Sequence, residues 1–403
     1  MALEPVEGDS RMKTSLLTTS RLVLLLVALL VPFPASAQQD ESVDEDESWG
    51  QLILELGAWI AEPGGLGDNV ASVTDPTDPF NNQVFGFSRG TRTQGYTRFG
   101  AELAGNRGRL LVTWYAHDDE ATLSARDPGN FIYGQLLAYP AYAGLSNDGL
   151  ADAFDARSVT SLSDLKIEYS RVAFSNSRVE GRWIAGYRKL VYHTRTDATY
   201  YALVPSFPAF LPPLVGALPN LTPLPDTASL VSNYKGSGLT GGMEFKAPIW
   251  RDKFVLEASF GLSVLLGKVN TEYRAVNFLY VLGGVILEAP YSELSDYFID
   301  PATGALIGTA ASVQQVSVGA GLRSDSLSRS SQVLETSIGA RWSPLSYMDV
   351  FLGYRIAHYN GVALDVRPRN IVVIGSAVNA IDASETDRSA TYKGFYGGVG
   401  FRF

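Results

Sequence analysis

Charged side chains recur at every second position in many apolar stretches of this 403-residue chain. In a β-strand, alternate residues point to opposite faces, so these charges share one face of the predicted strands. Around an aqueous interior they would line a weakly selective pore, whereas in a packed interior they would pair with one another. We predict pore-lining roles for Arg98, Glu102, Lys166, Glu168, Arg182, Arg188, Glu244, Lys246, Glu257, Glu335, Arg341, Asp349 and Arg355.

On the same parity lie Glu55, Arg109, Asp164, Glu180 and Arg402, so acids and bases are balanced on this face. A wide diffusion pore is not expected, because open porins have about 16–18 strands. Mixed charge along a narrow interior favours passage of small solutes or ions. A packed interior remains the alternative.

Histidine is the other residue type that could do chemistry, and the chain has three: His117, His193 and His358. An acid beside His117 could orient it as a general base. By parity, however, His117 points inward and His358 outward, so the histidines do not converge. The run from His117 to Glu120 lacks the spacing of a dedicated zinc site, and the chain has no cysteine. We expect no enzyme activity, no catalytic residue, no metal site and no cofactor.

Ten segments alternate strictly enough to predict strands. In each, one row of side chains is apolar and the other carries the charges. The predicted strands lie at residues 51–61, 96–104, 109–117, 164–170, 179–191, 239–246, 254–266, 334–342, 348–356 and 391–403.

The connections between these strands alternate in length. Those near residues 106, 176, 250 and 345 are short, and those at about 63–94, 119–159, 196–234, 269–329 and 361–389 are long. This alternation is typical of outer-membrane β-barrels, with short periplasmic turns and long extracellular loops. We predict an all-β, transmembrane, up-and-down antiparallel barrel of about ten strands. Twelve strands is the alternative, with residues 312–323 and 271–287 as the extra pair.

The closing segment, Thr391 to Phe403, ends on an aromatic residue. Phe395, Val399, Phe401 and Phe403 share one parity. This arrangement resembles the last strand of Gram-negative outer-membrane barrels, which implies that the four residues form part of the signal read by the barrel-assembly machinery. The same resemblance implies outer-membrane lipid and lipopolysaccharide as surroundings. It does not indicate an oligomeric state.

The first 37 residues have the pattern of a cleaved secretory signal peptide. Basic residues precede an apolar run from Leu22 to Phe33, and Ala35-Ser36-Ala37 supplies the small residues of a cleavage site. Met12 is an alternative start. Residues 38–48 form an acidic leader predicted to be disordered, and residues 49–403 form the barrel. The formal net charge of −10 argues against nucleic acid as a partner. We therefore expect export to the outer membrane.

Three long loops are unusually apolar: residues 131–145, 207–224 and 278–287. Exposed, they would form patches large enough to mark a binding site. They leave two functional alternatives to a pore: a structural or adhesive barrel that binds through these loops, and a transporter of hydrophobic solutes.

Two segments, GRWIAGYRKL at Gly181–Leu190 and ETSIGARWSPLSYMDVFLGYRIAHYNGV at Glu335–Val362, are similar to strand hairpins in pore-forming proteins related to the Legionella major outer membrane protein. The resemblance implies a porin-like role and transfers no specific residue. Cysteine-rich members of that family differ from this chain, which has no cysteine.

Overall fold

The structure is a computed structural model. It describes residues 50–64, 69–75, 78–103, 108–126, 131–134, 136, 149–151, 153–176, 178–201, 225–250, 253–282, 285–287, 313–374 and 377–403. The predicted signal peptide and acidic leader lie outside these residues, as do most of the apolar segment 131–145 and all of the apolar segment 207–224. No helix that could cross a membrane occurs in the described part of the chain.

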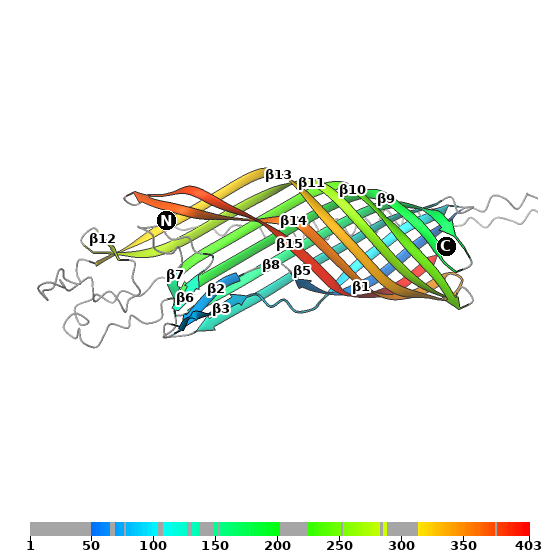
Figure 1. Ribbon diagram of the computed structural model, residues 1–403, viewed down its shortest axis with the longest axis horizontal. Helices are drawn as coiled ribbons and strands as arrows, with labels where there is room; N and C mark the ends of the chain where they lie inside the picture. Colours follow the sequence, from blue (N-terminus) through cyan, green and yellow to red (C-terminus); the bar gives the residue numbers. More distant parts are fainter. Residues whose placement is uncertain are drawn as a thin grey trace, which may run out of the picture. The chain divides into compact units, whose positions relative to one another are not determined.

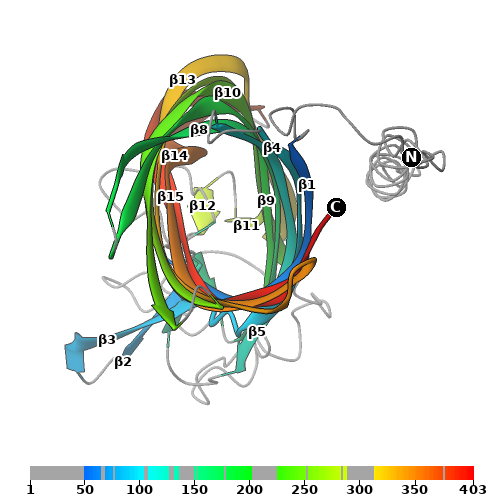
Figure 2. The same ribbon diagram turned by 90° about the vertical axis from the view of Figure 1, so that its right-hand side faces the viewer.

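Ten strands close into an antiparallel barrel (Figures 1 and 2), as the alternating segments predict. They are β1 (Gln51–Gly64), β4 (Arg92–Leu103), β5 (Gly108–Arg126), β8 (Ala153–Ser175), β9 (Glu180–Tyr201), β10 (Asp226–Trp250), β11 (Phe254–Leu282), β13 (Val313–Leu345), β14 (Met348–Ile374) and β15 (Ala377–Arg402). Neighbours in the chain pair with one another, and β1 pairs with β15 to close the ring.

Closure at the chain end is held by main-chain hydrogen bonds. The Leu52 amide donates to the Phe403 carbonyl and the Phe403 amide donates to the Leu52 carbonyl, each at 3.0 Å. The short connections, between β4 and β5, β8 and β9, β10 and β11, and β13 and β14, lie at the same end as the first and last strand residues. We call this end of the barrel the turn end and the opposite end the loop end.

The strands are longer than the alternation predicts. β11 has 29 residues and β13 has 33, whereas a bilayer needs about 9–11 per strand. Residues 271–282 and 313–323, the proposed extra pair of a twelve-stranded barrel, are the paired outer parts of β11 and β13. The expected long loop at 361–389 is also wrong: β14 and β15 continue as a paired hairpin to Ile374 and Ala377. Tertiary pairing therefore extends strands into sequence without clear alternation.

The outer face of the barrel is an apolar belt. Leu239 is 76% exposed, Leu266 72% and Ile338 64%. At the loop-end edge of the belt the outward positions become charged, with exposed Glu62, Asp118, Lys189, Lys235, Lys268 and Lys393. An apolar band bounded by charges is the surface that a bilayer requires of a barrel.

Short strands lie at the loop end. β2 (Asn69–Asp75), β3 (Asp78–Gly86), β6 (Phe131–Gly134) and β7 (Gly149–Ala151) form a separate small sheet, and β12 (Val285–Leu287) pairs with β11. Two hydrogen bonds tie the segments of the small sheet to the wall. The Tyr200 hydroxyl donates to the Val70 carbonyl at 2.6 Å, and the Tyr273 hydroxyl donates to the Leu136 carbonyl at 2.8 Å. Part of the chain between the wall strands therefore fills the loop end of the barrel.

Candidate functional site

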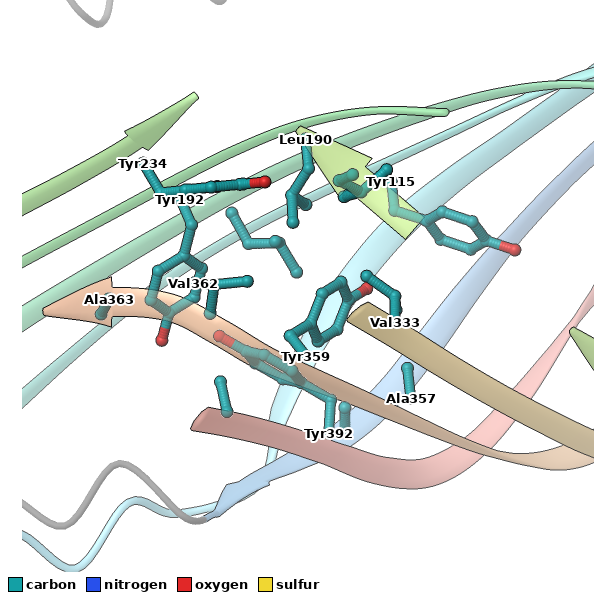
Figure 3. Packing of buried hydrophobic residues seen from close by; sticks show 14 of the residues in the cluster. Tyr115, Leu190, Tyr192, Tyr234, Val333, Ala357, Tyr359, Val362, Ala363 and Tyr392 are labelled. Atoms are coloured by element: carbon teal, nitrogen blue, oxygen red, sulfur yellow. The ribbon is translucent and has the colours of Figure 1, made fainter. Parts of the chain in front are cut away.

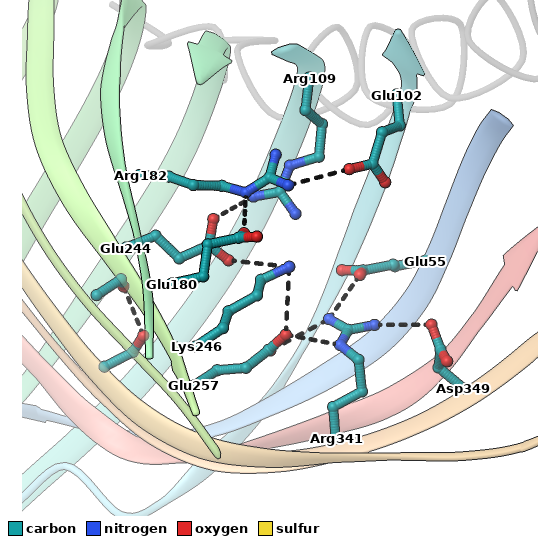
Figure 4. Close-up of polar contacts among 12 residues, drawn as sticks. Glu55, Glu102, Arg109, Glu180, Arg182, Glu244, Lys246, Glu257, Arg341 and Asp349 are labelled. Carbon is teal, nitrogen blue, oxygen red and sulfur yellow. Dashed lines mark hydrogen bonds and ion pairs between the residues drawn. The ribbon is translucent and has the colours of Figure 1, made fainter. Parts of the chain in front are cut away.

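The inward face of the turn half carries a network of ion pairs, which we call the charged network. Arg341 stands at its centre (Figure 4): its guanidinium contacts Glu55 at 2.8 Å, Glu257 at 2.9 Å and Asp349 at 3.3 Å. Strand alternation brings these four residues from β1, β11, β13 and β14 onto one interior surface. Arg341 is 8% exposed, so its charge is compensated by neighbours rather than by bulk water.

Nearer the turn end, the network continues across β4, β5, β9 and β10. Arg182 contacts Glu102 at 3.2 Å and also pairs with Glu180. Arg109 of β5 pairs with Glu244 of β10 across the lumen (Figure 4). This ion pair connects the two sides of the network at this level.

Deeper in the barrel, Glu335 gathers three cations. Its carboxylate contacts Lys166 at 3.0 Å and Arg188 at 3.1 Å, and it pairs with Arg355. Arg188 in turn holds Asp164 through its Nε at 2.9 Å. Each of the five charged residues in this inner cluster has a partner of opposite charge, as low-polarity surroundings require of buried charges.

Every one of the thirteen residues predicted to line a pore faces the interior and has an ion-pair partner. These partners are Glu55–Arg98, Glu102–Arg182, Lys166–Glu168, Lys166–Glu335, Arg188–Glu335, Glu244–Lys246, Glu257–Arg341, Asp349–Arg341 and Glu335–Arg355. The wall position of each was predictable from alternation. Because these charges pair with one another, the interior agrees better with the packed alternative than with a pore lined by unpaired charges.

A cavity of about 110 Å³ remains inside the charged network. Its lining includes Glu55, Arg98, Lys166, Glu335 and Arg355. Polar walls and this volume give room for several water molecules. The charged network therefore encloses a chamber that is large enough to hold water.

Above the chamber, towards the loop end, aromatic rings cross the interior. Trp59 and Tyr115 lie 6.3 Å apart and Tyr359 and Tyr392 lie 5.8 Å apart, measured between ring centroids. With Tyr192, Tyr234 and aliphatic neighbours they form one buried cluster (Figure 3), which we call the aromatic layer. Arg355 lies 3.9 Å from the Tyr115 centroid and 4.5 Å from that of Trp59, so the layer rests directly on the charged network.

A second polar level follows, built around Arg89 from the segment before β4. Its guanidinium contacts Asp119 at 2.9 Å, Thr160 at 2.8 Å and Ser158 at 2.6 Å. Arg92 holds the other oxygen of Asp119 at 3.0 Å. Nearby at the rim, the half-exposed Arg157 donates to Glu120 and lowers the pKa of this carboxyl. Beyond, a cluster of buried residues that includes Val70, Phe154 and Tyr273 occupies the loop end.

The hairpin of β14 and β15 enters the interior instead of continuing in the wall. The last β13 pair joins Gln332 to Asn360, and the last β1 pair joins Gly64 to Thr391. Beyond the bulge at residues 360–362, the four consecutive residues from Val362 to Asp365 are all buried, whereas a wall strand buries alternate residues.

The Leu364 amide donates to the Ser232 hydroxyl of β10 at 3.0 Å. In the ring, β13 and β11 separate β14 from β10, so the hairpin crosses over their inner faces. Gly361, with φ of 68°, makes the bend, since a left-handed backbone favours glycine. We call residues 361–390 the inner hairpin.

Sequence reasoning missed the aromatic layer, the Arg89 level and the inner hairpin. The only signal for the layer was parity: Tyr115, Tyr359 and Tyr392 occupy inward positions just beyond the charged ones. Arg89 fell in an expected loop.

The three histidines lie apart. His117 is buried beside Tyr392, His193 pairs with Asn233, and His358 contacts Thr391 Oγ1 at 2.8 Å. Among the described residues, no group of three acidic, histidine or cysteine side chains could hold a metal ion.

The chain matches no protein-family model and no curated protein sequence. Among solved structures it is similar to the outer membrane protease OmpT from Escherichia coli, at 7% identity over 90% of this chain and 99% of that protein, with a TM-score of 0.43. It is also similar to two toluene transporters. Pseudomonas putida TodX has 10% identity over 88% of this chain and 89% of its own, with a TM-score of 0.26. Ralstonia pickettii TbuX has 10% identity over 88% and 89%, with a TM-score of 0.27.

The comparisons give no support for the resemblance to pore-forming proteins related to the Legionella major outer membrane protein. The chemistry of this chain has to be argued from its own lumen.

Proposed function

We propose that this protein is a narrow outer-membrane conduit for small polar solutes or ions, closed in the conformation described above. The observation that carries the proposal is the charged chamber of about 110 Å³ inside a bilayer-compatible belt. A barrel that served only as a scaffold could fill this space with apolar side chains at lower cost, because buried ion pairs are often no more stable than hydrophobic replacements.

The chamber lies nearer the turn end, and the aromatic layer and inner hairpin separate it from the loop end. Short turns face the periplasm in outer-membrane barrels, so the chamber would communicate with the periplasm and the closure would face outward. The predicted signal peptide agrees with this orientation. Opening then requires the inner hairpin to leave the lumen, since residues Val362 to Leu364 are part of the aromatic layer.

A hairpin-shortened variant tests the proposal. Residues 361–388 would be replaced by a two-residue Asn-Gly turn, which leaves the pairs of β14 with β13 and of β15 with β1 intact. In planar bilayers we expect rare, small current steps from the wild-type protein and frequent, larger steps from the variant. Heat-dependent gel migration serves as the control for folding.

A specific observation supports a second function, a non-conducting barrel that binds partners at its loop end. The predicted pore-lining charges are all paired, and side chains fill the interior above them. If neither the folded wild type nor the folded hairpin-shortened variant carries current or passes a small uncharged solute, the conduit proposal is wrong and this second function replaces it. An axial route for hydrophobic solutes is disfavoured, because the charged network crosses the lumen.

A further inference from the structure

Leaving tyrosine hydroxyls aside, three buried side chains in or beside the aromatic layer have polar atoms without partners in the described part of the chain: Trp59 belongs to the layer, Gln94 is opposite it in β4, and His117 lies against Tyr392. Trp59 Nε1, both amide atoms of Gln94 and His117 Nε2 make no hydrogen bond to any residue that the structure describes. Their side chains are buried, with residue exposures of 0%, 2% and 3%. Buried donors and acceptors are normally satisfied by protein or by ordered water, so a group of them points to a ligand with hydrogen-bonding atoms.

The three side chains lie on one side of the lumen. Trp59 of β1 is opposite Gln94 of β4 in the strand register. The Tyr392 ring connects Trp59 with His117, because its centroid lies 6.2 Å from the first and 5.1 Å from the second. We call Trp59, Gln94 and His117 the polar gap.

The opposite side of the same layer is apolar. Leu190, Leu265 and Val333 come from β9, β11 and β13, and all three have 0% exposure. Tyr234 of β10 stands among them. Apart from tyrosine hydroxyls, this side of the layer presents apolar atoms, whereas the other side offers the hydrogen-bonding groups of Trp59, Gln94 and His117.

The polar gap joins the two polar levels of the lumen. On its turn side, Trp59 contacts Arg355, a lining residue of the chamber. On its loop side, His117 precedes by two residues Asp119, which holds Arg89 and Arg92. Along β1, β4 and β5, polar groups thus continue from the chamber to the Arg89 level.

We propose that the polar gap is the selectivity site of the conduit and that it passes water and small uncharged solutes with hydrogen-bonding groups, such as urea. An indole N–H, an amide and an imidazole offer donors and acceptors. The gap side chains carry no carboxylate or guanidinium, and the flanking charges are already paired, Arg355 with Glu335 and Asp119 with Arg89 and Arg92. An ion in the gap would therefore leave its hydration shell without a free compensating charge. This inference rests on the proposed conduit and narrows its substrate class.

Flux measurements test the inference. The refolded protein would be placed in lipid vesicles, and the permeation of water and urea would be followed by stopped-flow light scattering, beside potassium chloride currents in planar bilayers. In Gln94→Leu and Trp59→Phe we expect urea flux to fall about tenfold, since each removes hydrogen-bonding groups from the passage. Tyr234→Phe is the matched control: it removes a hydroxyl from the apolar side and should leave urea flux unchanged. Heat-dependent gel migration identifies variants that fail to fold, and Trp59→Phe keeps the ring if Gln94→Leu does not fold.

Three outcomes would overturn the assignment. Equal urea flux in wild type and both gap variants means that solutes pass elsewhere. If the hairpin-shortened variant carries potassium chloride current while the wild type passes no urea, the conduit stands and the polar gap is not its selectivity site. Silence of every folded variant in both assays overturns the conduit and the gap together.

Discussion

Glu335 is the shared anionic partner of Lys166, Arg188 and Arg355. We therefore expect its substitution to destabilise the charged network strongly. In Glu335→Gln the three cations lose their shared anion while remaining buried. Removing one partner of a buried ion pair costs about 3–5 kcal/mol, so we expect the free energy of unfolding to fall by about that amount. Urea titration in lipid vesicles, read by gel migration, measures it.

Glu120→Gln is the control for that substitution. Glu120 also pairs with an arginine, but the two side chains are 51% and 56% exposed, and solvent-screened ion pairs contribute little to stability. Equal losses in the two variants would contradict the account of the network as buried and mutually dependent.

Single residues were predictable where their type left no choice. Within the lipid-facing part of a strand, a carboxylate or guanidinium must face away from the apolar row, which placed Arg188, Glu335 and Arg341 in the interior, as the structure has them. Tyrosine suits either an interfacial girdle or a lumen, so parity alone could not assign Tyr359 to the aromatic layer. Gln94 was obscured because it belonged to an expected loop rather than to β4.

At the scale of elements, Gly361 controls where the inner hairpin goes. A Cβ at this position would meet no atom closer than 3.5 Å, so the effect of Gly361→Ala comes from its positive φ rather than from a clash. A side chain in the left-handed region costs about 1–2 kcal/mol. We expect the variant to release the hairpin more often and to raise the frequency of current steps in planar bilayers about tenfold.

Gly95→Ala provides the matching control for the bend. Gly95 lies in β4 with ordinary backbone geometry, and an added Cβ there would meet no atom within 4 Å. Its current steps should resemble those of the wild type. If both alanine variants behave alike, the bend at Gly361 does not govern opening.

Elements were predictable only where one face met lipid. In the belt, β13 alternates cleanly from Leu334 to Trp342, and its existence and direction follow from the sequence. Beyond the belt, the outer part of β11 alternates poorly in sequence, although its pairing with β13 continues. In the inner hairpin, the consecutive residues Val362 to Asp365 are all buried, so they show no strand alternation and fell in an expected long loop.

At the scale of the whole molecule, the number of strands was predictable from the alternating lengths of the connections rather than from how regularly each strand alternates. Alternating short and long connections require an even number of strands and place both ends of the barrel at the turn end. The pairing of Leu52 with Phe403 is this expected meeting of first and last strands. The role of Phe395, Val399, Phe401 and Phe403 in assembly stays a prediction. The lumen contents were not predictable, because they depend on which segments fold back inside.

The apolar belt makes a depth-dependent prediction about the whole barrel. Ile338 projects from the belt with 64% exposure, on the same face of β13 as Gln332 at the loop-end edge. Arginine on a lipid face costs about 2–4 kcal/mol at the bilayer midplane and about 0–1 near its edges. We therefore expect Ile338→Arg to lower the free energy of unfolding in lipid vesicles by about 2–4 kcal/mol, and Gln332→Arg to leave it almost unchanged. The penalty should shrink if the vesicles are made of thinner lipids, because the arginine then reaches the surface more easily. A cost that is equal at both positions, or independent of lipid thickness, would mean that this face of the barrel does not lie in a bilayer.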